Sequence, residues 1–165
     1  MKDAAFYTEH LHLLPHPEGG YYAETYRSEG IIPVSALNNF TGSRHYSTAI
    51  YYLLEKGDFS AFHRIKSDEC WHFYAGGPLL IYIIEQTGEL KIISLSNNFE
   101  KGQSFQYVVP ANCWFASRPA PGSEYCFVGC TVSPAFEFED LELANATELS
   151  VVYPQHKSFI EELCR

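Results

Sequence analysis

The chain has 165 residues, of which 46% are hydrophobic, so its length and composition predict one folded domain rather than a disordered segment. Its 20 acidic and 11 basic residues give a formal net charge of -9. This charge argues against nucleic acid as a partner and against an anionic membrane surface, because both are bound by basic protein surfaces.

The N-terminal region is predicted to begin with a helix over residues 3–13, where apolar residues recur at helical spacing until Pro15. Residues 16–20, His-Pro-Glu-Gly-Gly, have the composition of a turn. A strand is expected next, over residues 20–28, because two sets of side chains alternate along it.

The rest of the chain consists mostly of short aromatic and β-branched segments separated by glycine or proline turns. Strands are predicted within residues 45–58, 59–66, 69–77, 78–95, 103–110, 113–122 and 123–134, with a hairpin turn at Thr87–Gly88. Residues 135–150 are acidic with scattered apolar residues, and a short helix is expected after Pro154. About eight to ten strands with a helix at each end predict a mainly all-β fold, a sandwich or jelly roll, in a single domain of residues 1–165.

The most informative segment covers residues 57–76. On strand parity, His63 and Glu69 can point into one cavity from two successive strands. The other residues of the same parity are Ile65, Trp71 and Phe73. The cavity would then be mostly apolar and aromatic, with two ionisable groups that could bind a metal ion or transfer a proton.

This segment resembles the first sequence motif of the cupin superfamily. That motif has a glycine, then two histidines one residue apart, then a glutamate and a second glycine at fixed spacing. Gly57, His63, Glu69 and Gly76 keep that spacing, whereas Ile65 stands in place of the second histidine.

The second cupin motif is matched less well. It has a glycine, a Pro-x-Gly segment, two further residues and then a histidine. Gly102 and Pro110 are present, though farther apart than in the pattern, Asn112 replaces the second glycine and Phe115 replaces the histidine.

The chain is also similar, along its whole length, to one small group within the cupin superfamily. The segments that carry this resemblance are residues 14–22, 24–28, 48–54, 63–74 and 153–156. The resemblance implies a double-stranded β-helix, the cupin jelly-roll barrel, which is often a homodimer. It places the chain in the same structural class as metal-free deoxysugar epimerases, and it implies no established reaction.

A typical cupin metal is held by three histidines and one glutamate. By this resemblance, His63 and Glu69 would form only a partial ligand set, for a weakly bound divalent ion. The other two ligand positions are apolar, so we expect that no cofactor is required. Glu24, or His72 if a bulge turned it inward, could add a ligand.

Without a metal, His63 could act as a general base, with Glu69 orienting the imidazole and stabilising its cation. The general acid would be a tyrosine, for which the sequence offers Tyr52, Tyr22 and Tyr26. Such a set could remove a proton next to a carbonyl and return it to the other face, by analogy with metal-free epimerases of this fold. The residues expected to bind the ligand are Tyr22, Glu24, Tyr26, Trp71, Phe73 and Phe115.

Several of these residues also have a purely structural interpretation. His63 and Glu69 could be a buried pair that is retained without a function, and residues 16–20 could serve only to turn the chain. Strand parity places Glu24 and Arg27 on opposite faces, so they should not both face the cavity. Three histidines are not expected to bind a metal together: His10, His12 and His16.

Three functions therefore remain open. The chain could be an enzyme that isomerises or epimerises a sugar-like compound, a non-catalytic cupin that binds a small molecule, or a metal-dependent cupin such as a dioxygenase or an isomerase. The apolar ligand positions place the metal enzyme last. A highly anionic substrate is disfavoured, because Arg64 and Lys66 have the wrong parity to face the interior.

Partners and location follow from the same features. We expect a small-molecule ligand and a homodimer, since a jelly roll leaves sheet edges that need cover. The five cysteines form no paired motif, and the N-terminus does not resemble a signal peptide, so reduced thiols and a cytoplasmic location are expected.

Overall fold

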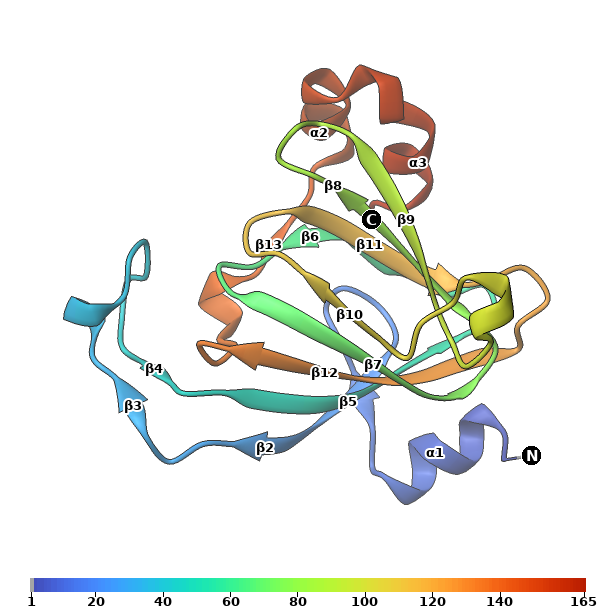
Figure 1. Ribbon diagram of the computed structural model, residues 1–165, viewed down its shortest axis with the longest axis horizontal. Helices are drawn as coiled ribbons and strands as arrows, with labels where there is room; N and C mark the ends of the chain where they lie inside the picture. The colour runs from blue at the N-terminus through green and yellow to red at the C-terminus, as the bar shows by residue number, and fades with distance from the viewer. Residues whose placement is uncertain (1) are drawn as a thin grey trace.

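The structure is a computed structural model that describes residues 2–165. Two antiparallel sheets face each other and enclose the main hydrophobic core, and short helices lie outside them (Figure 1). This arrangement confirms the prediction of a mainly β jelly-roll barrel with short helices near both ends of the chain.

The larger sheet has six strands. In spatial order they are β1 (Leu14–Pro15), β2 (Tyr21–Arg27), β5 (Thr48–Glu55), β12 (Tyr125–Ser133), β7 (Asp68–Gly76) and β10 (Gln106–Val109). The facing sheet has five: β13 (Glu142–Leu143), β6 (Ser60–Arg64), β11 (Trp114–Pro119), β8 (Leu79–Ile84) and β9 (Leu90–Leu95). Two short strands, β3 (Ile31–Ile32) and β4 (Arg44–His45), pair with each other in an arm that extends away from the barrel (Figure 1).

The helices are α1 (Ala4–His10), α2 (Ala146–Val152) and α3 (Lys157–Glu162). Single turns of 3-10 helix occur at Val34–Ala36, Phe99–Lys101, Phe138–Asp140 and Pro154–His156. Helix α2 lies partly in the acidic segment for which no helix was predicted. It begins after Asn145, whose side chain accepts hydrogen bonds from the backbone N–H groups of Thr147 and Glu148 at 3.0 and 3.1 Å.

The hydrophobic side chains form three clusters. The main core lies between the two sheets and includes Trp71 and Phe73 from β7 and Phe115 from β11. Helix α1 packs on the outer face of the six-stranded sheet, where Tyr7 stacks on Phe127 with ring centroids 4.4 Å apart. Helices α2 and α3 pack on the outer face of the five-stranded sheet. The helices thus leave the space between the sheets to the barrel's own side chains.

Strand β2 contains a bulge that alters which side chains face inward. Glu24 pairs with Ile50, while Tyr26 pairs with the adjacent residue Ala49, so Thr25 is the extra residue. Because one residue is added, Arg27 comes to lie on the same side of the strand as Glu24. The prediction that these two side chains face opposite sides is therefore wrong, since simple alternation does not hold across a bulge.

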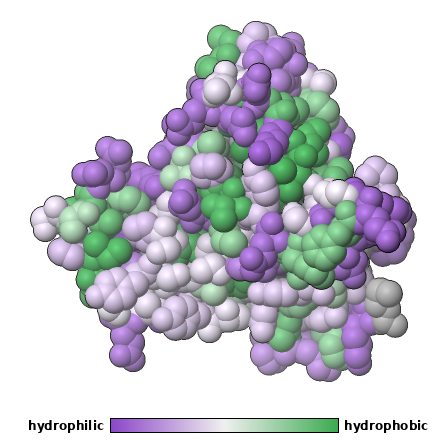
Figure 2. All heavy atoms as spheres, in the orientation of Figure 1, coloured by the Kyte–Doolittle hydropathy of each residue, from purple (hydrophilic) through white to green (hydrophobic). Residues whose placement is uncertain are grey.

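The surface of the molecule is mixed in polarity. Exposed apolar residues gather on the arm, which carries Ile31 and Val34 (Figure 2). Within residues 2–165, no helix is long and apolar enough to cross a lipid bilayer.

Candidate functional site

The turn at residues 16–20 brings a carboxylate into the wall of the barrel. Gly19 and Gly20 adopt φ angles of 114° and 69°, in the region that favours glycine. A Cβ atom at Gly20 would lie 2.6 Å from the carbonyl oxygen of Leu53, so a larger residue would push the turn away from β5. This close approach leaves Glu18 only 8% exposed to solvent.

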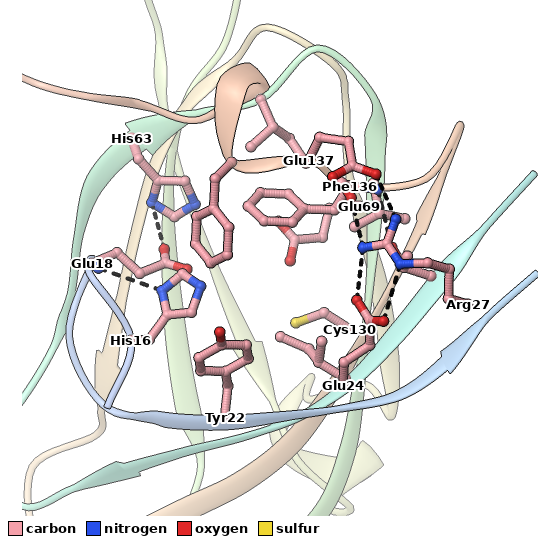
Figure 3. A pocket seen from close by; sticks show the side chains of 15 residues that line it. His16, Glu18, Tyr22, Glu24, Arg27, His63, Glu69, Cys130, Phe136 and Glu137 are labelled. Atoms are coloured by element: carbon pink, nitrogen blue, oxygen red, sulfur yellow. Dashed lines mark hydrogen bonds and ion pairs between the residues drawn. The ribbon is translucent and has the colours of Figure 1, made fainter. Parts of the chain in front are cut away.

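Glu18 holds the imidazole of His63 in place. Nδ1 of His63 lies 2.8 Å from Oε2 of Glu18 and 2.7 Å from the carbonyl oxygen of Ala61 (Figure 3). Both partners accept hydrogen bonds, so the proton is assigned to Nδ1, and Nε2 carries the lone pair when the ring is neutral. The prediction that Glu69 orients His63 is wrong, because Glu18 takes that position.

The carboxylate of Glu18 is also bound by two other side chains. Oε2 accepts a hydrogen bond from the hydroxyl of Ser60 at 2.7 Å, and Nδ1 of His16 lies 3.0 Å from Oε1. Burial opposes ionisation of Glu18, but the charge of His63 and the hydrogen bonds from both histidines outweigh it and hold the pKa of Glu18 well below its usual range.

The same pair changes the proton affinity of His63. Burial disfavours the imidazolium, but attraction to the Glu18 carboxylate, helped by its hydrogen bond and by the charge of Glu69, raises the pKa of His63 above 6.5. His63 is therefore a stronger base than a free histidine, and its cation has a partner inside the barrel.

Glu69 reaches the same cavity from the other sheet. It lies on β7, paired with Val109 on one side and Val132 on the other, and it is 8% exposed. Burial and the negative charge of Glu18 raise the pKa of Glu69 to about 7, although His63 opposes the shift. Glu69 can therefore hold a proton near neutral pH, unlike an ordinary glutamate.

These groups line one pocket with a cavity volume of about 110 Å³. Its ionisable lining comes from the 16–20 turn, β2, β6, β7 and β12, and Phe136 and Glu137 lie along one side (Figure 3). Phe138 also lines the pocket and is still 51% exposed, so the cavity reaches the surface beside this ring. For scale, a protein cavity of about 150 Å³ holds benzene, so the interior suits a small molecule.

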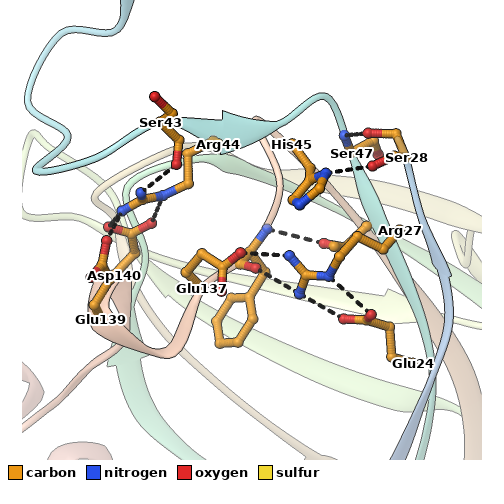
Figure 4. A network of polar contacts seen from close by, with 12 residues as sticks. Glu24, Arg27, Ser28, Ser43, Arg44, His45, Ser47, Glu137, Glu139 and Asp140 are labelled. Carbon is orange, nitrogen blue, oxygen red and sulfur yellow. Dashed lines mark hydrogen bonds and ion pairs between the residues drawn. The ribbon is translucent and has the colours of Figure 1, made fainter. Parts of the chain in front are cut away.

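A network of ion pairs fixes the 136–140 segment at the rim of the pocket (Figure 4). Arg27 donates to both oxygens of Glu24 at 3.0 and 2.8 Å and to Oε1 of Glu137 at 2.5 Å. Further along, buried Arg44 forms a bidentate pair with Asp140 at 2.7 and 2.8 Å. The two arginines thus tie this segment to β2 and to the arm.

The barrel fold agrees with comparisons to known proteins. A family model described as Cupin superfamily (DUF985) matches residues 6–144. The chain belongs to this cupin family. The cupin is 30% identical over 138 residues to the uncharacterized protein YML079W of Saccharomyces cerevisiae, an alignment that spans 78% of this chain and 68% of that protein.

Solved structures resemble the cupin over nearly its whole length. Protein SO0799 from Shewanella oneidensis has 39% sequence identity and a TM-score of 0.88, covering 100% of this chain and 99% of that one. A hypothetical protein from Leishmania major has 32% identity and a TM-score of 0.91, covering 99% of both chains. Oxalate decarboxylase from Bacillus subtilis has 13% identity and a TM-score of 0.55, covering 90% of this chain and 36% of that one, a likeness that shows the fold alone.

The structure removes two of the cupin's three candidate tyrosines from the pocket. Tyr52 is buried, and its hydroxyl donates a hydrogen bond to the carbonyl oxygen of Gly19 at 2.6 Å, so it braces the turn. Burial also raises the pKa of Tyr52 well above 10. Tyr26 follows the bulge and is 55% exposed, outside the pocket. Tyr22 does line the pocket, together with Glu24.

Three aromatic residues expected to bind the ligand belong instead to the main core. Trp71, Phe73 and Phe115 are interior, as strand parity predicts, but they pack between the sheets and do not line the pocket. Phe115 still has a part in the site, because its ring contacts the imidazole of His63 with centroids 4.1 Å apart. Phe115, which stands where the cupin motif has a histidine, thus packs against the histidine that the chain retains, His63.

The metal ligand set of a typical cupin is not fitted by the residues present. Across residues 2–165, no three His, Cys, Asp or Glu side chains form a group that could hold a metal ion. Nε2 of His63 keeps a lone pair that could bind a metal, but Glu24, a carboxylate that could complete the set, is paired with Arg27. His72, the other suggested ligand, contacts Thr131 on the neighbouring strand β12. The partial set of His63 and Glu69 therefore gains no third ligand here.

Sequence reasoning missed several residues of this pocket. Glu18 and His16 were given only structural or compositional roles, and Arg27, Cys130 and the 136–138 segment were not assigned to the site. One signal was present for the first two: a histidine and a glutamate flank a proline immediately before two glycines, an unusual place for ionisable side chains to be buried.

Proposed function

We propose that this cupin is a metal-independent isomerase or epimerase that moves a proton on a small, sugar-like carbonyl compound. The observation that carries the proposal is the pairing of two proton-exchanging groups in one small pocket. His63 presents a fixed imidazole from one sheet, and Glu69, with a pKa of about 7, comes from the other. Substrate bound between them would meet a base and an acid on different sides.

In the proposed reaction, Nε2 of neutral His63 removes a proton from the carbon next to the substrate carbonyl. The C–H electron pair forms the carbon–carbon double bond of an enolate, and the negative charge moves to the carbonyl oxygen. Protonated Glu69 then returns a proton to the carbon, on the other face for an epimerisation. The atoms and electrons of substrate and product are the same, so no oxidant or reductant is needed.

The surrounding residues support these two steps. The Glu18 carboxylate stabilises the imidazolium that forms when His63 takes up the proton. Tyr22 is the remaining tyrosine that could donate a hydrogen bond to the developing enolate oxygen. Because His63 and Glu69 interact, their protons titrate as a pair, and either member could begin the reaction.

A test of this proposal uses deuterium. Candidate small ketoses, aldoses and related carbonyl compounds are incubated with the protein in deuterated water, and incorporation at the carbon next to the carbonyl is followed by NMR. For a compound that the wild type exchanges, we expect His63→Asn to slow incorporation by about 10²-fold or more, the usual contribution of a general base. His72→Asn, on a histidine outside the pocket, should leave the rate unchanged.

The opposite result has a clear meaning. Equal incorporation by the wild type and a folded His63→Asn variant would overturn the role of His63. A compound that stabilises the protein in a thermal-shift screen, but never gains deuterium, would favour the non-catalytic binding function. The homodimer and the cytoplasmic location stay predictions.

A further inference from the structure

We infer that the pocket selects a small ligand carrying an ammonium group and rejects carboxylates and phosphates. The inference rests on the proposed function only in taking this pocket as the substrate site, and it adds the chemical class of the substrate. Three features carry it: the balance of charges, the aromatic side chains near the rim, and the size of the cavity.

The charged groups of the pocket have an excess of negative charge. Three carboxylates line it, from Glu18, Glu24 and Glu137, against the single guanidinium of Arg27. Protonation of both His63 and His16 would balance these three carboxylates, and ionisation of Glu69, the fourth lining carboxyl, then leaves one negative charge in excess. Glu69 has a pKa of about 7, so its ionisation makes the pocket more negative as the pH rises.

The one guanidinium in the pocket is already bound. Arg27 donates to both oxygens of Glu24, to Oε1 of Glu137 and, at 3.3 Å, to the carbonyl oxygen of Phe136 (Figure 4). An anionic ligand would have to displace a carboxylate to reach it. Among residues 2–165, the second oxygen of Glu137 accepts no hydrogen bond, so an acceptor is left for a cationic donor.

Aromatic rings line the same cavity as these carboxylates. Phe138 lies 5.1 Å from Phe136 and 6.5 Å from Tyr22 between ring centroids, and His16 is within 5.8 Å of Phe138. The faces of phenyl and phenol rings attract cations. Carboxylates beside aromatic rings therefore form a setting that suits an ammonium group better than a neutral hydroxyl or an anion.

The volume limits the rest of the ligand. A cavity of about 110 Å³ accommodates one small ring or a short chain. A nucleoside diphosphate sugar would leave its phosphates at the rim, where Glu24 and Glu137 repel them. The substrate class that fits is a single small amine-bearing unit of about one ring or a short chain.

The experiment compares probes of similar size and different charge. Piperidinium, tetrahydropyran and cyclopentanecarboxylate are titrated into the full chain at pH 7.5, with binding followed by ligand-observed NMR and calorimetry. We expect piperidinium to bind about tenfold more tightly than tetrahydropyran, as a charged hydrogen bond or a cation–π contact can provide. Binding of the carboxylate should not be detected. A carboxylate that binds as tightly as piperidinium would overturn the inference without any variant.

Variants then locate the selectivity. Glu137→Gln should cost most of the piperidinium preference while leaving tetrahydropyran binding unchanged. Glu139→Gln is the matched control, because Glu139 lies two residues away, pairs with Arg44 and does not line the pocket. Equal effects of the two substitutions would contradict the inference, and Glu24→Gln offers a second test if Glu137→Gln loosens the rim.

These measurements stay separate from the test of catalysis. Probe binding is an equilibrium property that does not need turnover. If His63→Asn and the wild type both prefer piperidinium, and neither exchanges deuterium, the charge selection is supported and the proton-transfer function fails. Exchange that depends on His63, without any preference for the cation, would contradict the charge selection alone.

Discussion

The proton affinity of His63 depends on a carboxylate that comes from a turn in the N-terminal part of the chain. Glu18 contacts Nδ1 directly and is the first of the charges that raise the pKa of His63 against the effect of burial. The same negative charge contributes to the raised pKa of Glu69. One residue therefore favours the protonated form of both groups proposed to exchange protons.

Replacing Glu18 by Gln should lower both pKa values. The nearby Glu18 carboxylate favours the charged form of the imidazole, so the pKa of His63 should be clearly lower in the variant. The pKa of Glu69 should fall as well, because a negative neighbour is lost. Side-chain NMR titration of His63 and Glu69 measures both changes.

Glu137→Gln serves as the comparison, since Glu137 contacts Arg27 and not His63. Its His63 titration should match the wild type. A His63 pKa that is unchanged in Glu18→Gln would mean that Glu69, as the sequence suggested, is the main partner of the imidazole.

Individual site residues were only partly predictable from the sequence. His63 and Glu69 could be placed in one cavity because the register shifts of β6 and β7 lie outside the stretches used, between Ser60 and His63 and between Phe73 and Ala75. Glu18 could not be assigned as the partner of His63, because the path of a turn with two glycines at positive φ does not follow from its composition. Tyr52 has the right parity to face inward, but parity cannot show that its hydroxyl donates a hydrogen bond to the carbonyl oxygen of Gly19.

The 16–20 turn is the element that builds the site, and its glycines can be tested against a matched glycine elsewhere. Gly20 and Gly102 have nearly the same φ angle, 69° and 71°. A Cβ atom at Gly20 would meet the Leu53 carbonyl oxygen at 2.6 Å, whereas one at Gly102 would meet no atom within 4 Å. The two positions therefore share the backbone cost of alanine and differ in the steric cost.

We expect Gly102→Ala to lower the free energy of unfolding by about 1 kcal/mol, the cost of a left-handed backbone without glycine. Gly20→Ala should lower it by about 1–3 kcal/mol more, because the turn must move away from β5. Urea denaturation measures both. Equal losses would show that the turn yields easily, and a normal His63 pKa in Gly20→Ala would show that Glu18 does not need the tight turn.

Secondary structure was predictable where alternation or turn glycines are regular, and not elsewhere. The hairpin of β8 and β9 follows from its Thr-Gly turn, and Gly88 has the expected positive φ of 85°. The bulge at Thr25 gives no signal in a strand of mixed polar and aromatic residues, so Arg27 was placed on the wrong face. Helix α2 did have a signal, since Asn145 is followed three residues later by Glu148, the pattern of a capping box.

The molecule as a whole places its ionisable pocket between two sheets whose other facing side chains are mostly apolar. That arrangement follows from the many short strands with inward apolar residues, and the fold class could be read from them. Burial in such a barrel has a thermodynamic consequence, because groups with shifted pKa values couple folding to pH. The free energy of unfolding of the whole chain should therefore depend measurably on pH through the groups of this pocket.

The signs can be worked out group by group. Glu69, with its pKa raised from 4.5 to about 7, and His63, with its pKa raised above 6.5, both bind protons more tightly in the folded state. Their contribution to stability is full at low pH and is lost as the pH rises through these folded pKa values. Glu18 has the opposite sign, because its pKa is lowered in the folded state. Its stabilisation is present above pH 4.5 and is lost as the pH falls below that value.

Glu69→Gln isolates the contribution of one carboxyl. At pH 4.5 the variant and the wild type should differ little, because the wild-type side chain is then neutral as well. By pH 8 the variant should gain up to about 3 kcal/mol relative to the wild type, the free energy that corresponds to the shift of the Glu69 pKa. Urea denaturation at pH 4.5, 6, 7 and 8 follows the difference, with Glu29→Gln, a substitution at an exposed residue outside the pocket, as the control. Parallel curves for Glu69→Gln and the wild type would mean that Glu69 is ionised throughout this range, and it could not then donate the proton that the proposed reaction requires.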